Sequence, residues 1–180
     1  MTTYISILRG INVSGHKIIK MDALKKMCAE LNFTNVQTYI QSGNIIYQSK
    51  LSGTERISNT IKENIKKVFG FDVPVITFTK TELESVINSN PFLRDKSKDP
   101  AFFHVTFLSE KPETINADLL KQADLKNDRY EITDKAIYLY CPDSYSSSKL
   151  TNSFIEAKLK VNATTRNWKT ANELIKTAAK

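Results

Sequence analysis

One strand–helix pattern occurs twice in this chain of 180 residues, and it restricts the fold more than any other feature. Each half follows the order strand, helix, strand, strand, helix, strand, and one further helix comes after it. This βαββαβ order is that of the ferredoxin-like split arrangement, a four-stranded antiparallel sheet with two helices on one face. The sequence therefore predicts an α+β protein of two ferredoxin-like halves with antiparallel sheets, each half followed by an extra helix.

The periodicity of apolar residues supports this pattern in the first half. Residues 21–31 carry apolar side chains at the i, i+3, i+4, i+7 spacing of an amphipathic helix, and residues 57–69 repeat that spacing over a longer stretch. Residues 36–41 and 45–48 are rich in β-forming residues and flank Ser42-Gly43-Asn44, a sequence typical of a tight turn. We therefore expect a β-hairpin between the two helices.

The second half repeats the pattern after a stretch that has none. Residues 90–100 contain two prolines and alternating charges without a hydrophobic period, which is typical of a linker. A strand is expected at 102–108, a hairpin at 130–141 and a closing helix at 168–179. The predicted division is a first half at 1–89, a linker at 90–100 and a second half at 101–180.

Composition narrows the classes of function. No apolar run approaches the roughly 20 residues of a membrane span, and no signal-peptide pattern opens the chain. Two cysteines without CxxC spacing and two histidines do not make a metal site, so we expect none. We expect a cytoplasmic protein. The net charge of +7 favours acidic partners, but a lysine-rich surface chosen for solubility explains this charge better.

Two stretches place an arginine and an asparagine just ahead of a predicted helix. The first leaves the first strand with Arg9 and Asn12 and continues to Lys17; the second contains Arg166 and Asn167. Backbone N–H groups are free and the dipole is positive where a helix begins, which is an environment that binds anions. A loop held by internal pairing of Arg9 and Asn12, and a helix capped by Asn167, are the structural alternatives. The spacing Gly10-x4-Gly15-His16-Lys17 is not that of a nucleotide-binding P-loop, and we expect no cofactor.

The predicted hairpin adds a third group of polar residues. Tyr39 and Gln41 share a parity and would face the same side of the sheet, and Asn44 ends the turn. A plain tight turn explains Ser42 to Asn44, but it does not require Gln41. Tyr39, Gln41 and Asn44 are therefore candidate ligand-binding residues.

Four motifs carry a family resemblance that spans nearly the whole chain. They are Ile7–Val13 (ILRGINV), Lys20-Met21, Thr38–Asn44 (TYIQSGN) and Thr164–Trp168 (TTRNW), in this order. The chain resembles a bacterial family of unknown function whose members open with an LLRGINVGG-like run. The resemblance implies a two-half α+β fold and no established activity, substrate or catalytic residue. Ser14 stands where a second glycine is usual, which implies a stiffer first loop.

These observations leave several functions open. The leading hypothesis is an uncharacterised protein that binds a small anionic ligand or a nucleic-acid phosphate through Arg9, Asn12, Lys17, Tyr39, Gln41, Asn44, Arg166 and Asn167. One alternative is an enzyme acting on a phosphorylated or carboxylated metabolite, in which Arg9 and Arg166 would hold the anion and Tyr39 or His16 would donate a proton, although no catalytic motif assigns this role. The other alternative is a homo-oligomeric interaction module. Tyr138 and Tyr140 alternate with apolar residues, as on the base-stacking sheets of RNA-recognition domains, but the rest of that signature is absent.

Overall fold

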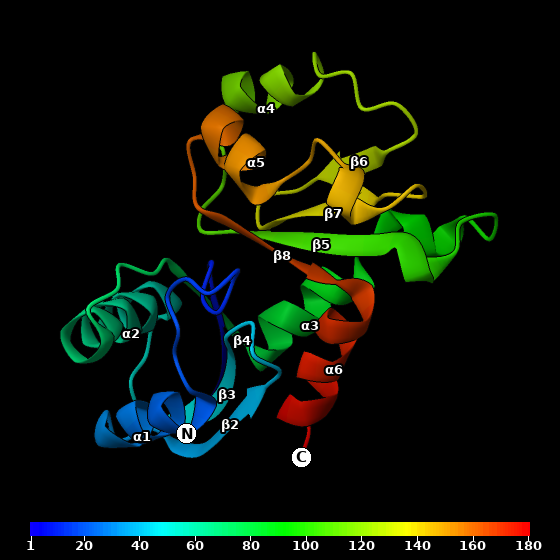
Figure 1. Cartoon of the computed structure of the whole chain (residues 1–180). Coiled ribbons are helices and arrows are strands. Elements are labelled where there is room, and N and C mark those ends of the chain that lie inside the picture. The colour runs from blue at the N-terminus through cyan, green and yellow to red at the C-terminus, as the bar shows by residue number, and fades with distance from the viewer. The chain divides into compact units, whose positions relative to one another are not determined.

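The computed structural model describes residues 1–180, and its first unit is a four-stranded antiparallel sheet with two helices on one face (Figure 1). The strand order β2-β3-β1-β4 is that of a ferredoxin-like fold. The elements are β1 (Thr2–Leu8), α1 (Met21–Glu30), β2 (Thr34–Tyr39), β3 (Asn44–Ser49), α2 (Thr54–Phe69) and β4 (Val75–Thr79).

The core of the first unit lies between this sheet and the helices α1 and α2. Alternate residues of the central strand β1 point into it, and so do the apolar faces that the helical periodicity predicts. Phe33 and Tyr47 stack at 4.4 Å between ring centroids within this core. Gly70 ends α2 in the left-handed conformation, as is usual for a helix C-terminus.

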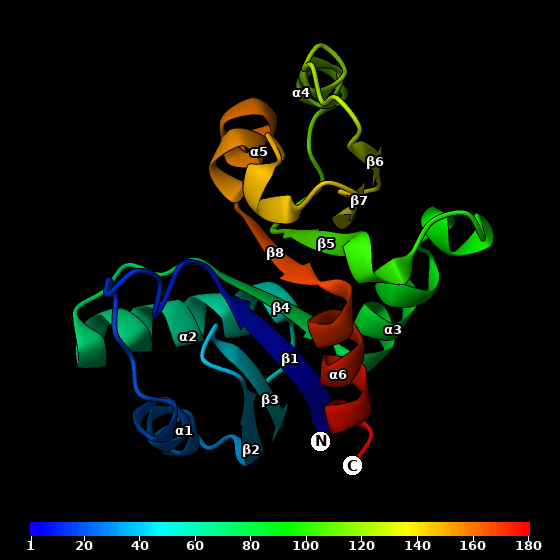
Figure 2. The same cartoon turned by 45° about the vertical axis from the view of Figure 1, so that its right-hand side comes forward.

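The second unit repeats this topology. Its strand order β6-β7-β5-β8 corresponds to β2-β3-β1-β4 of the first unit, and every pair is antiparallel (Figure 2). The elements are β5 (Phe103–Leu108), α4 (Thr114–Leu120), β6 (Arg129–Ile132), β7 (Ala136–Tyr140), α5 (Asn152–Leu159) and β8 (Ala163–Asn167). The predicted fold class, two ferredoxin-like halves with antiparallel sheets, is confirmed.

One further helix follows each half, as expected: α3 (Lys80–Asn88) and α6 (Trp168–Ala178). Two short 3-10 helices, Pro91–Arg94 and Pro100–Phe102, lie within or at the end of the predicted linker, where Phe92 is buried. The compact units comprise Met1–Ser85 with Glu173–Lys180, and Val86–Asn172. The last turns of α6 thus belong to the first unit. The division of the chain into domains at 1–89 and 101–180, joined by a linker at 90–100, stays a prediction.

Both units contain the same hydroxyl contact between the central strand and an edge strand. Ser6 and Thr77 share a hydrogen bond of 2.8 Å across β1 and β4, and Ser58 of α2 donates to Thr77 over 2.8 Å. In the second unit, Thr106 and Thr165 share a 2.7 Å bond across β5 and β8. Because these hydroxyls are buried or half-buried, their mutual bonds remove the cost of desolvating them and fix how the helix lies on the sheet.

The sequence predicts only that Arg166 lies just ahead of a helix, and the structure adds that it lies within a strand. The strand β8 extends to Asn167, so Arg166 is a strand residue that lies immediately before α6. None of the helices is long and apolar enough to cross a membrane.

His104 of β5 makes the stability of the second unit depend on pH. Its ring is half-buried and stacks on Tyr145 at 4.6 Å, and burial lowers the pKa of His104 below its usual value. The unfolded chain therefore binds a proton more readily than the folded chain does. The free energy of unfolding is thus fully present at pH 8 and decreases as the pH falls through 6.5 toward the folded-state pKa of His104.

Chemical denaturation at pH 8 and pH 5 tests this assignment to His104. The free energy of unfolding should decrease more between these pH values for the wild type than for His104→Gln, and equal decreases would contradict the assignment.

Candidate functional site

Two loops meet at one end of the first sheet, where β1 and β2 both end. The first loop runs from residue 9 to residue 20, and the second is the hairpin turn at residues 40–44; we call them the loop pair. Ile11 and Ile19 anchor the first loop, because both are buried in the core of the unit. Within the loop, Val13 and His16 form an isolated bridge around Ser14-Gly15, and both turn residues have positive φ.

The side chain of Asn12 ties the two loops together. Its Oδ1 accepts the backbone N–H of Ile19 at 2.9 Å, and its Nδ2 donates to the carbonyl of Ile19 at 3.0 Å. The same Nδ2 donates to the carbonyl of Gln41 at 2.8 Å, which is the contact with the second loop. Three hydrogen bonds use both amide protons and one lone pair of the acceptor, so Asn12 positions the backbone around the site.

Gly43 brings the hairpin turn into direct contact with the first loop. Its φ is +82°, and a Cβ built there would lie 2.7 Å from Cδ1 of Ile11 and 2.8 Å from Cβ of Leu8. The backbone N–H of Leu8 donates to the carbonyl of Gly43 over 2.8 Å. Next to it, buried Asn44 donates to the carbonyl of Tyr39 at 2.9 Å and to Oγ of Ser42 at 3.0 Å. The turn is thus fixed from both sides.

The surface of the loop pair is cationic and partly apolar. Between residues 1 and 54 the only carboxylates are Asp22 and Glu30, against six lysines and arginines. His16 and Lys20 are exposed, and Arg9 is half-buried where β1 ends. Lys17 donates from Nζ to the carbonyl of Asp72 over 2.6 Å. Three apolar side chains also project from the loop pair: Val13, Ile18 and Ile40 are 56%, 55% and 49% exposed.

Ile40 is held in an unfavourable backbone conformation. Its φ is +50°, in the left-handed region, where a β-branched side chain is a rare outlier. The neighbouring hydrogen bonds of Asn12 to Gln41 and of Asn44 to Tyr39 hold the chain on either side of it. Such strain clusters at functional sites, and here it keeps an apolar side chain at the surface.

The structure gathers six of the eight candidate residues at the loop pair: Arg9, Asn12, Lys17, Tyr39, Gln41 and Asn44. Asn12 and Asn44 have mainly positioning contacts, while Lys17 reaches the surface beside Asp72. Gln41 is exposed and Tyr39 is half-buried at the end of β2. Sequence reasoning did not select Ile40, although an apolar residue within a polar motif was a visible signal.

The other two candidates belong to the second unit. Arg166 is buried, its Nη1 donates to Oγ1 of Thr164 at 3.1 Å and to the carbonyl of Thr165 at 3.0 Å, and burial lowers the pKa of its guanidinium to about 10. It therefore still carries its charge at neutral pH. Asn167 accepts the backbone N–H of Thr170 at 2.8 Å and caps α6, which is the structural alternative expected for it.

Other side chains that could react or stack on a ligand are buried in the protein. Burial raises the pKa values of the Cys28 and Cys141 thiols to about 12, which disfavours the nucleophilic thiolate. Tyr138 is buried and donates to the carbonyl of Val86 at 2.6 Å, so its ring has no exposed face on which a base could stack. No group of three or more histidine, cysteine or carboxylate residues lies close enough together to hold a metal.

The fold and the loop pair define an α+β protein of two ferredoxin-like units, the first of which presents a rigid cationic loop surface. The chain belongs to the family described as "Protein of unknown function (DUF1697)", whose profile matches residues 1–138. Its fold is similar to that of a conserved bacterial protein, SP0830 from Streptococcus pneumoniae, with a TM-score of 0.71 over 98% of both chains at 21% sequence identity. A comparison with curated proteins gave no match.

Two glycines of the loop pair allow a test of the close contact at Gly43. Both Gly15 and Gly43 have positive φ, but only Gly43 lacks room for a Cβ. We expect Gly15→Ala to lower the free energy of unfolding by about 1 kcal/mol through backbone strain alone. Gly43→Ala should lower it by about 2–4 kcal/mol, because steric overlap adds to the same strain. Urea denaturation of both variants measures the difference, and equal losses would show that the loops are not in tight contact.

The strain at Ile40 predicts a stabilising substitution. Asparagine tolerates the left-handed conformation, so Ile40→Asn should raise the free energy of unfolding by about 1 kcal/mol. Val13→Asn is the matched control, since Val13 is similarly exposed and its φ is not positive. Thermal and urea unfolding should show the gain for Ile40→Asn only. A loss of stability in Ile40→Asn would mean that the apolar contacts of Ile40 outweigh its strain.

Proposed function

We propose that the loop pair binds a phosphate-bearing ligand, and that single-stranded nucleic acid is the class it suits best. The observation that carries this proposal is the combination, on one rigid surface, of Lys17, Lys20 and His16 with the projecting side chains of Val13, Ile18 and Ile40. The two lysines suit phosphates, and the apolar side chains suit the ribose and base faces that an unpaired strand exposes.

The geometry favours an extended ligand over a small enclosed one. Side chains that are half or more exposed project from the surface and do not surround a small molecule. The scarcity of carboxylates in residues 1–54 leaves a positive surface around the loops, with the carboxylate of Asp72 engaged by Lys62 at 3.4 Å. A surface of this kind attracts a polyanion over several ångströms, within the Debye length of physiological salt.

Rigidity contributes to the proposed binding. Asn12, Gly43 and Asn44 fix the backbone of both loops, so little conformational entropy is lost when a ligand orders the surface. Five residues between 10 and 17 have positive φ, and successive backbone N–H groups in such turns form concavities that favour anions.

The binding test is fluorescence anisotropy with a 12-nucleotide single-stranded RNA and DNA at several salt concentrations. We expect binding that weakens steeply as salt rises, because phosphate contacts release counterions. Lys17→Gln/Lys20→Gln should reduce the slope of log K against log salt by about 1 to 1.5, corresponding to two phosphate contacts on a single strand. Lys149→Gln/Lys169→Gln is the charge-matched control on exposed lysines of the second unit, and its slope should stay near that of the wild type.

Three results would count against the proposal. The first is the absence of binding to either oligonucleotide at low salt. The second is an equal loss of affinity in the Lys17/Lys20 and Lys149/Lys169 variants, which would indicate a response to net charge alone. The third is tight binding that salt does not weaken.

A further inference from the structure

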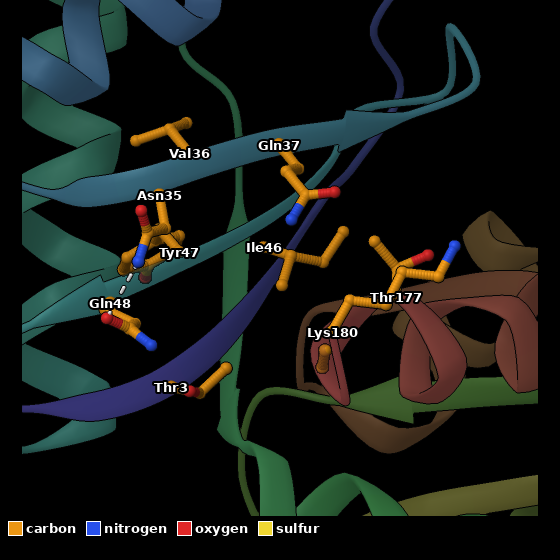
Figure 3. A pocket seen from close by; sticks show the side chains of 10 residues that line it. Thr3, Asn35, Val36, Gln37, Ile46, Tyr47, Gln48, Thr177 and Lys180 are labelled. Carbon is orange, nitrogen blue, oxygen red and sulfur yellow. Dashed lines mark hydrogen bonds between the residues drawn. The ribbon is translucent and has the colours of Figure 1, made fainter.

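A separate pocket of about 430 Å³ lies in the first unit, on the sheet face opposite α1 and α2 (Figure 3). Its walls are the ends of β1, β2 and β3 and the last turn of α6, all of which belong to this unit. The loop pair follows the other end of β1, so the two sites are distinct. A pocket of this size is within the range that encloses small molecules.

The strand register decides which side chains face this pocket. Thr3 lies opposite Gln48, and Gln37 lies opposite Ile46, so these four side chains share one face of the sheet. Tyr47 points the other way, into the core against Phe33. Figure 3 shows Gln37 and Ile46 directed toward Thr177 of α6 across the pocket.

A β-bulge in β2 adds a third amide to this face, that of Asn35. The pairing of β2 with β3 shifts register between Thr34 and Gln37, and Asn35 within the shift has a φ of +53°. This conformation directs the Asn35 amide onto Gln48, with Nδ2 donating to Oε1 over 3.0 Å, drawn as a dashed line in Figure 3. The bond fixes the Gln48 amide, whose Nε2 keeps two donors, while Oδ1 of Asn35 remains an acceptor.

The pocket is therefore lined by carboxamides and hydroxyls with one apolar wall. Gln37, Thr3 and Thr177 make no side-chain hydrogen bond within the protein. Ile46 supplies a buried apolar contact, and Lys180 is the only charged residue among those that line the pocket. No aspartate or glutamate side chain lines the pocket.

From this arrangement we infer that the pocket binds a nucleobase, presented by a nucleoside 5′-monophosphate. Carboxamides match the adjacent donor and acceptor groups on the edge of a nucleobase, and glutamine or asparagine makes such paired bonds in nucleic-acid recognition. Ala178, half-buried at the end of α6, offers an apolar contact for the ring, and the Lys180 ammonium offers a positive charge for the phosphate. This inference does not depend on the function proposed for the loop pair.

The test is isothermal titration of the full chain with AMP, GMP, CMP and UMP, together with the matching nucleosides and ribose 5-phosphate. We expect 1:1 binding of at least one nucleoside monophosphate at 0.3 M salt, with chemical-shift changes in the side-chain amides of Gln37 and Gln48. Gln37→Leu/Gln48→Leu should weaken that binding about 10-fold or more through two lost hydrogen bonds. Lys180→Gln should weaken binding of the monophosphate about 2–5-fold, and binding of the nucleoside much less.

The controls separate this pocket from the loop pair and from misfolding. Gln122→Leu changes an exposed glutamine of the second unit, and Lys17→Gln/Lys20→Gln changes the loop pair; both should leave mononucleotide affinity unchanged. Thr177→Val is a milder variant that tests the helical wall if the double substitution unfolds the unit. The inference is overturned if no nucleobase compound binds, if ribose 5-phosphate binds as tightly as the nucleotides, or if the Gln37/Gln48 and Thr177 variants bind like the wild type.

Discussion

The contact between Gly43 and the first loop is the constraint on which the rest of the candidate site depends. A Cβ at position 43 would overlap Ile11 and Leu8, so only a glycine lets the hairpin turn lie against the end of β1. That approach puts the carbonyl of Gln41 within reach of the Asn12 amide, which in turn holds residue 19. Without it, Lys17, Lys20 and Ile40 would lie on two independent loops. With it, they form one surface of fixed shape.

The chain maintains this surface against local preferences. Nine residues other than glycine have positive φ, and four of them (Asn12, Ser14, Lys17 and Ile40) lie in the loop pair. The core compensates for this strain by burying Ile11 and Ile19 completely. A polar, flexible loop would be less strained in the folded state, so the strain indicates that the shape of this surface matters.

The fold could be predicted from the sequence because its signals are local. Helical spacing at 21–31 and 57–69 and β-forming runs around Ser42-Gly43-Asn44 define the elements, and the βαββαβ order limits the topology.

The site was only partly predictable, because its contacts join residues far apart in sequence. Asn12 was a visible candidate, yet its partners Ile19 and Gln41 are determined by tertiary structure, and these partners make it a positioning residue. Arg166 was expected just before a helix, where backbone N–H groups are free to bind an anion. In the structure it lies within β8, which continues for three residues past Thr164, and its side chain is buried. The pocket of Gln37, Gln48 and Thr177 had no sequence signal, since a β-bulge and a helix end create it.

The central claim is that the loop pair is a preformed surface for phosphate-bearing strands. Backbone amide chemical shifts of ¹⁵N-labelled protein, followed as a 12-nucleotide single-stranded RNA is added at low salt, test it most directly. The account predicts saturable shifts in residues 10–20 and 40–44, with few changes in the exposed faces of α2 and α5. Shifts spread evenly over lysine-rich surfaces, or confined to residues outside the loop pair, would contradict it.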